Sequence, residues 1–551
     1  MVAEVSSGGL SSISESTFYM EFNRLTCHGS RARRHVSPVE TNMSNAMVGF
    51  RYARVVVRPV ANASTHAAPG PDFTFDLLQN LPVPTASLSY TDDTISIDRE
   101  SSDDGESTYL IDLYYQFFHP AHPIVIPPRI YLQDHGVIPK HLSKAMRAVG
   151  CHFTTKNPEP YLHEAKEILA SSEPDDAFKV QALLILAITS FARFEREGGG
   201  NMLTQAVHVA QKIGLNDAHY GLGEQALLKE SYRRTWWELY TIVGIVSLIM
   251  PFGLKVDIAW NLPLPCHCEE YNNGQTSPTK TLQDMQHRFL AEESFSWSSF
   301  SYKVEAIRIL TNIIDLSGDP FTSQSQVDAA AISIASFWMD LPVSKRDVIC
   351  RSGKTDEVLF CAHMLMSLGS ICLHLPRSGM QSIQHFKTSC WTDRARKVDE
   401  NTASHKAAAI KAASRLTRLM SSGQSTKTHT PCFACAIAFA TAVQLPAYME
   451  ENEPFVAQML KEQVQLAIST LRQIGETWPI ASVVRSQVAQ YAREVIGKPV
   501  VPVNRPLTLE SAPTAADPIL GNQEWLQELL QGTQMDDLMF QSSDYPTPSR
   551  D

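Results

Sequence analysis

The chain has 551 residues, of which 44% are hydrophobic and 19% are charged, and its formal net charge at pH 7 is −11. These proportions are ordinary for a globular protein, and the length allows several domains or one large helical array with tails. The negative charge excludes a nucleic-acid-binding polycation, so any contact with DNA must be local or made by a partner.

Ten cysteines are spread thinly along the chain, and several lie inside apolar stretches such as 348–350 and 359–361. This placement is typical of buried, reduced thiols in a cytosolic or nuclear protein, and not of a secreted disulfide framework. Residues 1–12 show no basic region followed by an apolar run, so no signal peptide is expected. The longest apolar run, 239–254, contains Pro251 and is shorter than the roughly 20 residues that a membrane span needs.

Residues 1–107 are rich in Ser, Thr, Asn, Pro and Ala without a sustained apolar period, which predicts a mostly disordered segment. It contains a short basic knot formed by Arg31, Arg33 and Arg34. Such a knot serves as a nuclear-import address or contacts phosphate, but a solvated basic patch is the commoner explanation.

Order is expected to begin at Thr108, where apolar positions at helical spacing predict a helix that stops at His119-Pro120. Residues 121–128 must then run extended, because proline fixes its own φ and disfavours helix in the residue before it. Further helices are predicted over 140–149, 160–171, 177–197, 202–213 and 224–250. Gly198-Gly199-Gly200 is expected to end the third of these, as glycines do at helix C-termini.

The last of these helices contains Trp236-Trp237, and its sequence pattern is the clearest in the chain. At least one of the two rings is expected in the core, and Arg233 and Arg234 are expected to pair with carboxylates or to cap a neighbouring helix. After a polar break at 269–280, helices are predicted over 297–316, 327–341, 355–375, 402–420, 431–450, 455–477 and 480–496.

The expected fold of residues 108–497 is therefore all-α. Because the connections are short, consecutive helices should lie antiparallel, which gives an irregular array of helical hairpins between a disordered N-terminal segment and a C-terminal tail. No strict repeat at a fixed period supports a regular solenoid.

The tail, residues 498–551, contains prolines and carries eight acidic and three basic side chains. Bulky apolar residues alternate there with carboxylates, and they are Trp525, Leu526, Leu529, Leu530, Leu538, Met539 and Phe540. This composition suits a segment that folds as an amphipathic activation helix in the groove of a partner. The alternative is a terminal helix that docks on the protein's own core.

Catalytic motifs are absent from the sequence, which has no Walker loop, no G-x-S-x-G and no H-E-x-x-H. Gly221-x-Gly223-x-x-Ala226 has dinucleotide-turn spacing, but no strand is predicted before it. Cys432-x-x-Cys435 and Cys266-His267-Cys268 lack the four paired ligands of a structural zinc site, and the first pair is expected to be buried thiols. We therefore expect no enzyme, no catalytic or cofactor-binding residue and no metal ligand.

Three blocks, in order, resemble the fungal-specific transcription factor domain, which is the middle homology region of the fungal zinc binuclear cluster transcription factors. The first is YYQFFHPAHPI at 114–124. The second combines QALLILA at 181–187 with AVHVAQKIGL at 206–215. The third and most recognisable is ESYRRTWWELY at 230–240.

The resemblance implies an all-α regulatory domain, a nuclear location and a role in RNA polymerase II transcription, often of a metabolic or secondary-metabolite pathway. Two features depart from the family pattern. The usual Gly-Arg-Pro turn is replaced by Met250-Pro251-Phe252-Gly253, and the first 150 residues hold only Cys27 where the family has six closely spaced cysteines. No zinc cluster of that type is therefore expected, and no other cofactor is.

The leading hypothesis is a transcription regulator of a fungal metabolic gene set that acts through its helical domain and acidic tail. Its expected partners are the transcription machinery or other regulators, in a homo- or heterodimer if it dimerises, and no membrane. The family binds DNA, but no intact DNA-binding module is seen in this sequence. The alternative hypothesis is a helical protein-interaction scaffold outside transcription.

Overall fold

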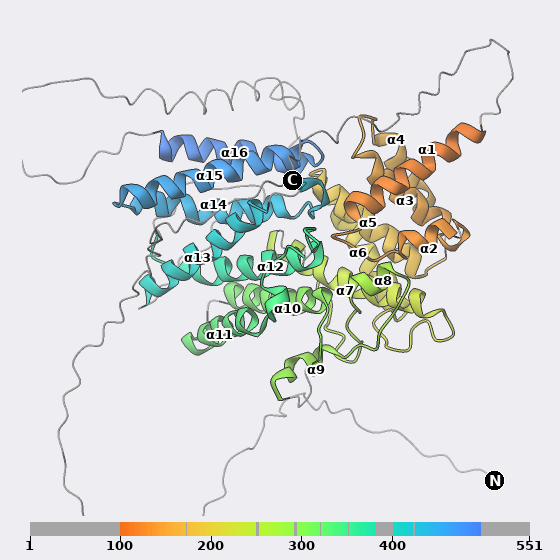
Figure 1. Ribbon diagram of the computed structural model, residues 1–551, viewed down its shortest axis with the longest axis horizontal. Helices are drawn as coiled ribbons and strands as arrows, with labels where there is room; N and C mark the ends of the chain where they lie inside the picture. Colours follow the sequence, from red (N-terminus) through yellow and green to blue (C-terminus); the bar gives the residue numbers. More distant parts are fainter. Residues whose placement is uncertain are drawn as a thin grey trace, which may run out of the picture. The chain divides into compact units, whose positions relative to one another are not determined.

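The computed structural model describes residues 100–497, except for 134, 172–173, 250–252, 291–294, 320, 351, 381–400 and 423–424. Within these residues the chain is all-α (Figure 1), and the only β-type pairings are isolated bridges at Pro263–Thr281 and Ile349–Thr355. The fold class predicted from the sequence is confirmed for this part of the chain. The expected domain limits at 107 and 497 remain a prediction.

The first half of the helical domain runs from α1 to α7. Its elements are α1 (Glu100–Leu113), the π-helical turn η1 (Tyr114–Phe118), α2 (Pro128–Gln133), η2 (His135–Val137), α3 (Lys140–Cys151), α4 (Glu159–Ala170), α5 (Ala177–Ala192), α6 (Arg196–Lys212) and α7 (Ala226–Ile249).

The second half contains the longer helices α10 to α16 and several short elements. They are α8 (Cys268–Asn272), α9 (Leu282–Gln286), η3 (Arg288–Leu290), α10 (Ser299–Gly318), α11 (Gln324–Asp340), η4 (Val343–Lys345), α12 (Glu357–His374), η5 (Leu375–Arg377), α13 (Thr402–Met420), η6 (Thr426–Thr428), α14 (Phe433–Glu450), α15 (Pro454–Gly475) and α16 (Pro479–Ile496).

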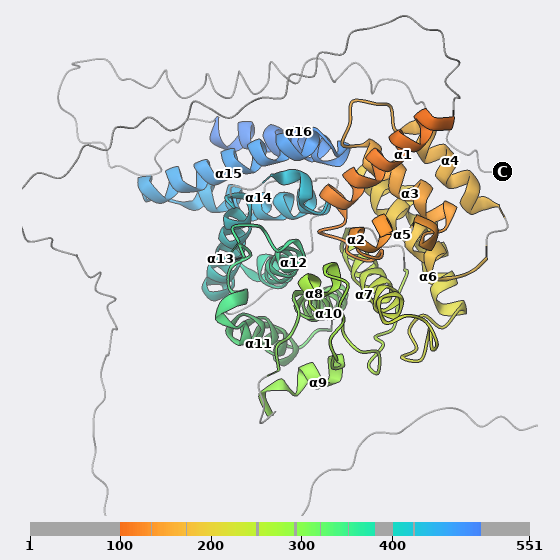
Figure 2. The same ribbon diagram turned by 45° about the vertical axis from the view of Figure 1, so that its right-hand side comes forward.

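Neighbouring helices pack as the short connections predict. α5 packs along α6, and α12 to α15 each contact the next helix in the chain, so α14, α15 and α16 lie side by side in both views (Figures 1 and 2). α10 packs along α12 and also contacts α7, which makes it one of the links between the two halves.

The start of the first helix differs from the sequence-based expectation. α1 begins at Glu100 instead of Thr108, so the Ser-rich, charged stretch just before Thr108 is helical. The apolar content of this stretch alone does not predict a helix. The last turns of α1 are stabilised by packing against α3 and η1.

The glycine triplet was also placed wrongly, because Gly198, Gly199 and Gly200 lie inside α6. The turn after α5 is made instead at Phe194, whose φ of 69° lies in the left-handed region. Gly199 is needed for close approach, since a Cβ there would lie 2.9 Å from the Phe191 ring. The glycines therefore allow α6 to pack against the end of α5.

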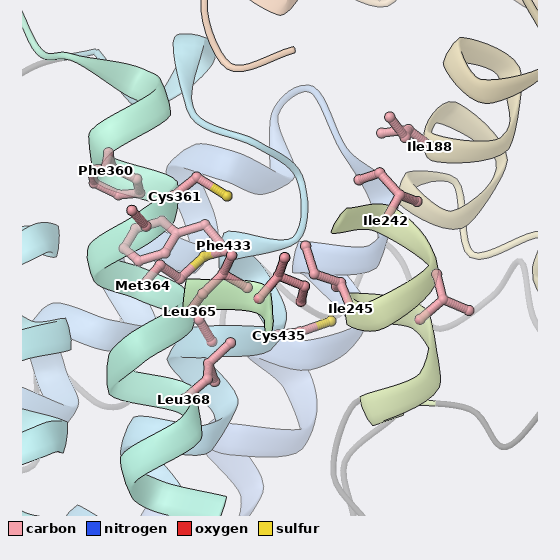
Figure 3. Packing of buried hydrophobic residues seen from close by; sticks show 14 of the residues in the cluster. Ile188, Ile242, Ile245, Phe360, Cys361, Met364, Leu365, Leu368, Phe433 and Cys435 are labelled. Carbon is pink, nitrogen blue, oxygen red and sulfur yellow. The ribbon is translucent and has the colours of Figure 1, made fainter. Parts of the chain in front are cut away.

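One continuous core fills the helical domain. Figure 3 shows part of it, where Ile242 and Ile245 of α7 lie between Ile188 of α5 and Cys435 of α14, and Phe360 of α12 packs against Phe433 of α14. Two helical stretches, 357–377 and 433–450, are long and apolar enough to cross a bilayer. In the most apolar part of each, 89% and 83% of the residues are buried in the protein. Their composition is accounted for by their central position in the core.

The cysteines largely follow the expectation of free thiols. Cys151, Cys266, Cys268, Cys350, Cys361, Cys372 and Cys432 are free, and most of them are buried. Cys435 is the exception, since it is disulfide-bonded. Cys432 is a free thiol but is only partly buried, so of the expected pair of buried thiols only the free state of Cys432 is confirmed.

Candidate functional site

The three sequence blocks of the first half meet around residues 121–127. This segment is not helical, and every one of its residues is buried. A buried irregular segment leaves backbone carbonyl groups that a helix would have satisfied, and each unpaired one is costly. The partners of these carbonyls identify the residues that hold the segment in place.

Aromatic and histidine side chains satisfy the end of the segment. The Tyr115 hydroxyl donates to the Ile126 carbonyl at 3.0 Å, and Tyr271 of α8 donates to Val125 at 3.0 Å. His119 also reaches the Val125 carbonyl, at 3.2 Å from Nε2. Burial lowers the pKa of His119 to about 4, so at neutral pH the ring is uncharged and donates its single N–H.

Helices α5 and α7 hold the middle of the segment through the Ile124 carbonyl. It accepts from Gln181 Nε2 at 3.0 Å and from Ser231 Oγ at 2.6 Å. The same Gln181 amide nitrogen lies 2.9 Å from both Ser231 Oγ and Thr235 Oγ1. Ser231 and Thr235 are one turn apart on α7, so a single glutamine fixes the register of α7 against α5 and the segment.

Arg234 joins α7 to the chain that follows it. Its side chain is fully buried, and its Nε donates to Glu230 Oε1 at 2.9 Å while Nη2 donates to the Cys266 carbonyl at 2.8 Å. Its guanidinium carbon lies 4.0 Å from the centre of the Tyr271 ring. The expectation that Arg233 and Arg234 pair with carboxylates is confirmed, and Glu230 serves both, with Arg233 Nη1 at 2.6 Å.

A second buried ion pair joins α7 to α10. Lys303 Nζ donates to both oxygens of Glu238, at 2.6 and 2.9 Å, and neither side chain is exposed to solvent. His122 of the extended segment completes the group, with Nδ1 2.7 Å from Glu238 Oε1. Lys303 also reaches the Ala121 carbonyl at 3.3 Å. The segment is thereby tied to the second half of the domain.

The ionisation of this group follows from its surroundings. Burial opposes the charge on Glu238, but the Lys303 ammonium and His122 outweigh it and hold the pKa of this carboxyl below its ordinary value. Burial likewise opposes the charge on Lys303, yet Glu238 raises the pKa of the ammonium. Burial lowers the pKa of His122, so the ring is neutral and donates Nδ1–H to the carboxylate.

We call the set Gln181, Glu230, Arg234, Glu238 and Lys303, with residues 121–127, the central polar network. Its charged side chains are paired and buried, and its donors form hydrogen bonds with carboxylates and backbone carbonyls of the protein itself. Proton transfer to a substrate requires that a group reaches the substrate. The geometry of the network therefore indicates a structural role, in which the three sequence blocks stabilise the fold.

The cavity beside Ile188 and Ile245 is also a poor ligand site. It is lined mainly by apolar side chains of α5, α7 and α14, and its free volume is about 40 Å³. A volume of this size holds a water molecule or two, whereas ligand pockets measure roughly 300–1,000 Å³.

The residues that the sequence singled out for function lie outside the described residues. These are Arg31, Arg33 and Arg34 of the basic knot and Trp525, Leu526, Leu529, Leu530, Leu538, Met539 and Phe540 of the tail. Their roles in nuclear import and activation stay predictions.

The other sequence features have structural places. Trp236 and Trp237 are both buried, and Trp237 Nε1 donates to the Pro263 carbonyl at 3.0 Å. Gly221 and Gly223 have positive φ in the turn before α7, which is not preceded by a strand in the described part of the chain. In the same part, no group of three His, Cys, Asp or Glu side chains is arranged to hold a metal ion.

Sequence reasoning missed His122, Gln181 and Lys303 as partners. Only the His-Pro spacing around the extended segment signalled that something must hold it. Lys303 gave no signal, because a single lysine in a helical pattern is ordinarily solvent-exposed.

Comparisons with known proteins give the family to which these blocks are related. Residues 111–348 match the family described as fungal specific transcription factor domain. The C6 finger domain transcription factor iacK of Pestalotiopsis fici is 29% identical over 401 residues, which are 70% of this chain and 59% of that protein. The chain thus spans less than two thirds of the length of this relative. No solved structure matches the chain.

Proposed function

We propose that the protein is a nuclear transcription regulator of a metabolic gene set, such as one for a secondary metabolite, because residues 111–348 match the family described as fungal specific transcription factor domain. The observation that carries the proposal is the family match, which contains all three sequence blocks and the whole central polar network. The relative's name, C6 finger domain transcription factor, supports the same role.

The packing of the network supports a division of labour within the chain. Residues that mark the family point inward, so contacts with the transcription machinery must come from other surfaces. The acidic tail with its apolar residues suits such contacts, because carboxylates keep the apolar side chains solvated until a partner binds them. We propose that residues 521–551 are this activation segment.

The first 150 residues do not supply the ligands of a zinc cluster for a DNA contact. The formal net charge is −11, and the first 150 of these 551 residues hold one cysteine, Cys27. A binuclear zinc cluster needs several thiolate ligands, which this stretch does not supply. Contact with the target genes is therefore proposed either through another DNA-binding protein or through a DNA-binding module outside these residues.

The activation role is tested with the full chain fused to an unrelated DNA-binding module, with and without residues 521–551, on a reporter gene. We expect activation that is lost on deletion and is also lost when Trp525, Leu529 and Phe540 are changed to alanine. The matched control changes Ser542 and Ser543 to alanine, which leaves every apolar and acidic residue of the tail in place. Equal reporter activity with and without the tail would exclude this mechanism and favour a scaffold.

A nuclear address is tested separately with a fluorescent fusion of the full chain. Changing Arg31, Arg33 and Arg34 together to alanine is expected to move the fusion from the nucleus to the cytoplasm. If the variant stays in the nucleus, the basic knot is not an import signal, and the alternative of a solvated basic patch holds.

A further inference from the structure

A polar cleft opens between α11, α12, α13 and the chain that follows α11. We call it the arginine cleft, and its volume of about 420 Å³ lies within the range of small-molecule sites. It is lined by Trp338, Leu341, Arg346, Asp347, Val348, Ile349, His363, Ser367, Arg415, Arg418, Leu419, Ser421 and Ser422. The α12 and α13 residues lie beyond 348, outside the family match.

The charges of the cleft are unbalanced. Three arginines face one carboxylate, Asp347, which leaves a surplus of two positive charges. Asp347 accepts a backbone N–H from Ile349 at 3.0 Å and forms no ion pair with the arginines. Among the described residues, no carboxylate pairs with Arg415 or Arg418, whereas Arg346 uses its Nε on the Leu341 carbonyl at 3.2 Å.

The inner wall combines a cation, an aromatic ring and an unused donor. Arg415 is half-buried, and its guanidinium carbon lies 4.1 Å from the centre of the Trp338 ring. The Trp338 indole N–H is buried and has no hydrogen-bond partner among the described residues. His363 stands edge-on to the same ring at 5.0 Å, with its Nε2 bonded to the Lys345 carbonyl at 3.0 Å.

This arrangement is costly without a negative charge. Burial, and secondarily the Arg418 guanidinium, lower the pKa of Arg415 below its ordinary value. An indole N–H can only donate, and a guanidinium only donates, so every unused group on this wall calls for an acceptor. Carboxylate and phosphate groups are the acceptors that match the planar fork of an arginine.

We infer that the arginine cleft binds a small organic anion, with its carboxylate or phosphate group on Arg415 and Arg418 and its apolar part toward Trp338 and Leu419. The exposed Arg346 lies at the rim and attracts the anion. The volume accommodates a molecule of metabolite size but not a folded partner. The inference concerns binding by the helical domain, and it does not depend on how the acidic tail functions.

The test measures binding of inorganic phosphate, phenyl phosphate and benzoate to the purified full chain by calorimetry and tryptophan fluorescence. Sodium chloride at equal ionic strength serves as the reference for unspecific screening. We expect saturable binding of at least one aromatic anion with one site per chain. Tighter binding of phenyl phosphate than of benzoate would assign a phosphate ligand, and the reverse order would assign a carboxylate.

Variants locate the binding in this cleft. Arg415→Gln is expected to weaken the affinity at least tenfold, and Arg418→Gln to weaken it less, because Arg418 is more exposed. Trp338→Phe should abolish most of the fluorescence change on binding. Arg472→Gln, which removes an exposed arginine of α15 that does not line the cleft, is the matched control and should bind like the wild type.

Three results would overturn the inference. They are no saturable binding of any probe, unchanged affinity in both Arg415→Gln and Arg418→Gln, and an equal loss of affinity in Arg472→Gln. Thermal unfolding of each variant without ligand shows whether it is folded. If Arg415→Gln does not fold, Arg418→Gln and Arg346→Gln decide the question, because both remove exposed side chains.

Discussion

The central polar network and the arginine cleft place charged groups in opposite situations. In the network, Lys303 and Arg234 are fully buried, and each has a carboxylate within hydrogen-bond distance, Glu238 and Glu230. In the cleft, Arg415 and Arg418 are half-buried or exposed and have no carboxylate partner among the described residues. The first arrangement pairs its charges within the chain, whereas the second leaves its charges open to water and to an anion that binds.

The difference shows why the residues that resemble the family and the residues that would bind a ligand can be different ones. A buried charge must be paired within the chain, so its partners constrain the fold. A charge at the edge of a cleft can remain unpaired, because water screens it until an anion arrives. The network lies inside residues 111–348, while most of the cleft's polar wall comes from α12, α13 and the turn after α13.

The largest expected effect comes from breaking the network at Glu238. Glu238→Ala leaves the Lys303 ammonium buried without a counter-charge, and we expect a loss of about 3–5 kcal/mol in unfolding free energy. Urea unfolding followed by circular dichroism measures it. The exposed Glu224→Ala is the matched control and should change the unfolding free energy by less than about 0.5 kcal/mol.

The double variant Glu238→Gln with Lys303→Met separates pairing from burial. It removes both charges, so it should cost clearly less than Glu238→Ala does. If the double variant were as unstable as Glu238→Ala, an unpaired charge would not be the cause.

A smaller loss is expected when the extended segment loses one donor. Gln181→Leu leaves Ile124 with the Ser231 hydroxyl alone and removes the link to Thr235, which should cost about 1–3 kcal/mol. The measurement is again urea unfolding, with Gln458→Leu on the exposed face of α15 as the control. An unfolding free energy equal to that of the wild type would mean that Gln181 does not hold the segment.

Acid should weaken both regions through their buried histidines. Burial lowers the pKa of His119, which contacts the network at Val125, and of His363 in the cleft wall to about 4, from an ordinary 6.5. The unfolded chain therefore takes up protons first, and stability is full above pH 6.5 and falls as the pH drops toward 4. One such histidine contributes at most about 1.4 kcal/mol per pH unit.

His119→Gln tests this dependence, because glutamine offers an N–H to the Val125 carbonyl but does not titrate. Between pH 6.5 and 5.5 the unfolding free energy of the variant should fall less steeply than that of the wild type. Parallel pH profiles for the two proteins would contradict the assignment.

The smallest effect on stability is expected in the cleft. Arg415→Gln breaks no ion pair and loses only the contact with Trp338, so the unfolding free energy should change by less than about 1 kcal/mol. A loss as large as that of Glu238→Ala would show that Arg415 serves the fold, and the contrast between the two regions would disappear.

Local pattern was enough to predict most helices of the described part. Apolar spacing located α7 and α10 to α16 to within a few residues, and prolines identified 121–127 as non-helical. The exceptions are places where packing outweighs local preference. Gly198–Gly200 lie inside α6 because Gly199 meets the Phe191 ring, and α1 extends to Glu100.

The sequence by itself therefore determined the all-α class, the position of the Trp236-Trp237 helix and the extended course of the residues that follow Pro120. Only the tertiary structure decided which charges are paired, since Glu238 finds its partners at His122 and Lys303 in other parts of the chain, and Arg415 finds no carboxylate among the described residues. Helical periodicity is a property of neighbouring residues, and a sequence displays it directly. Pairing between distant side chains depends on how the helices pack. The sequence alone therefore does not distinguish an arginine that has a carboxylate partner from one that has none.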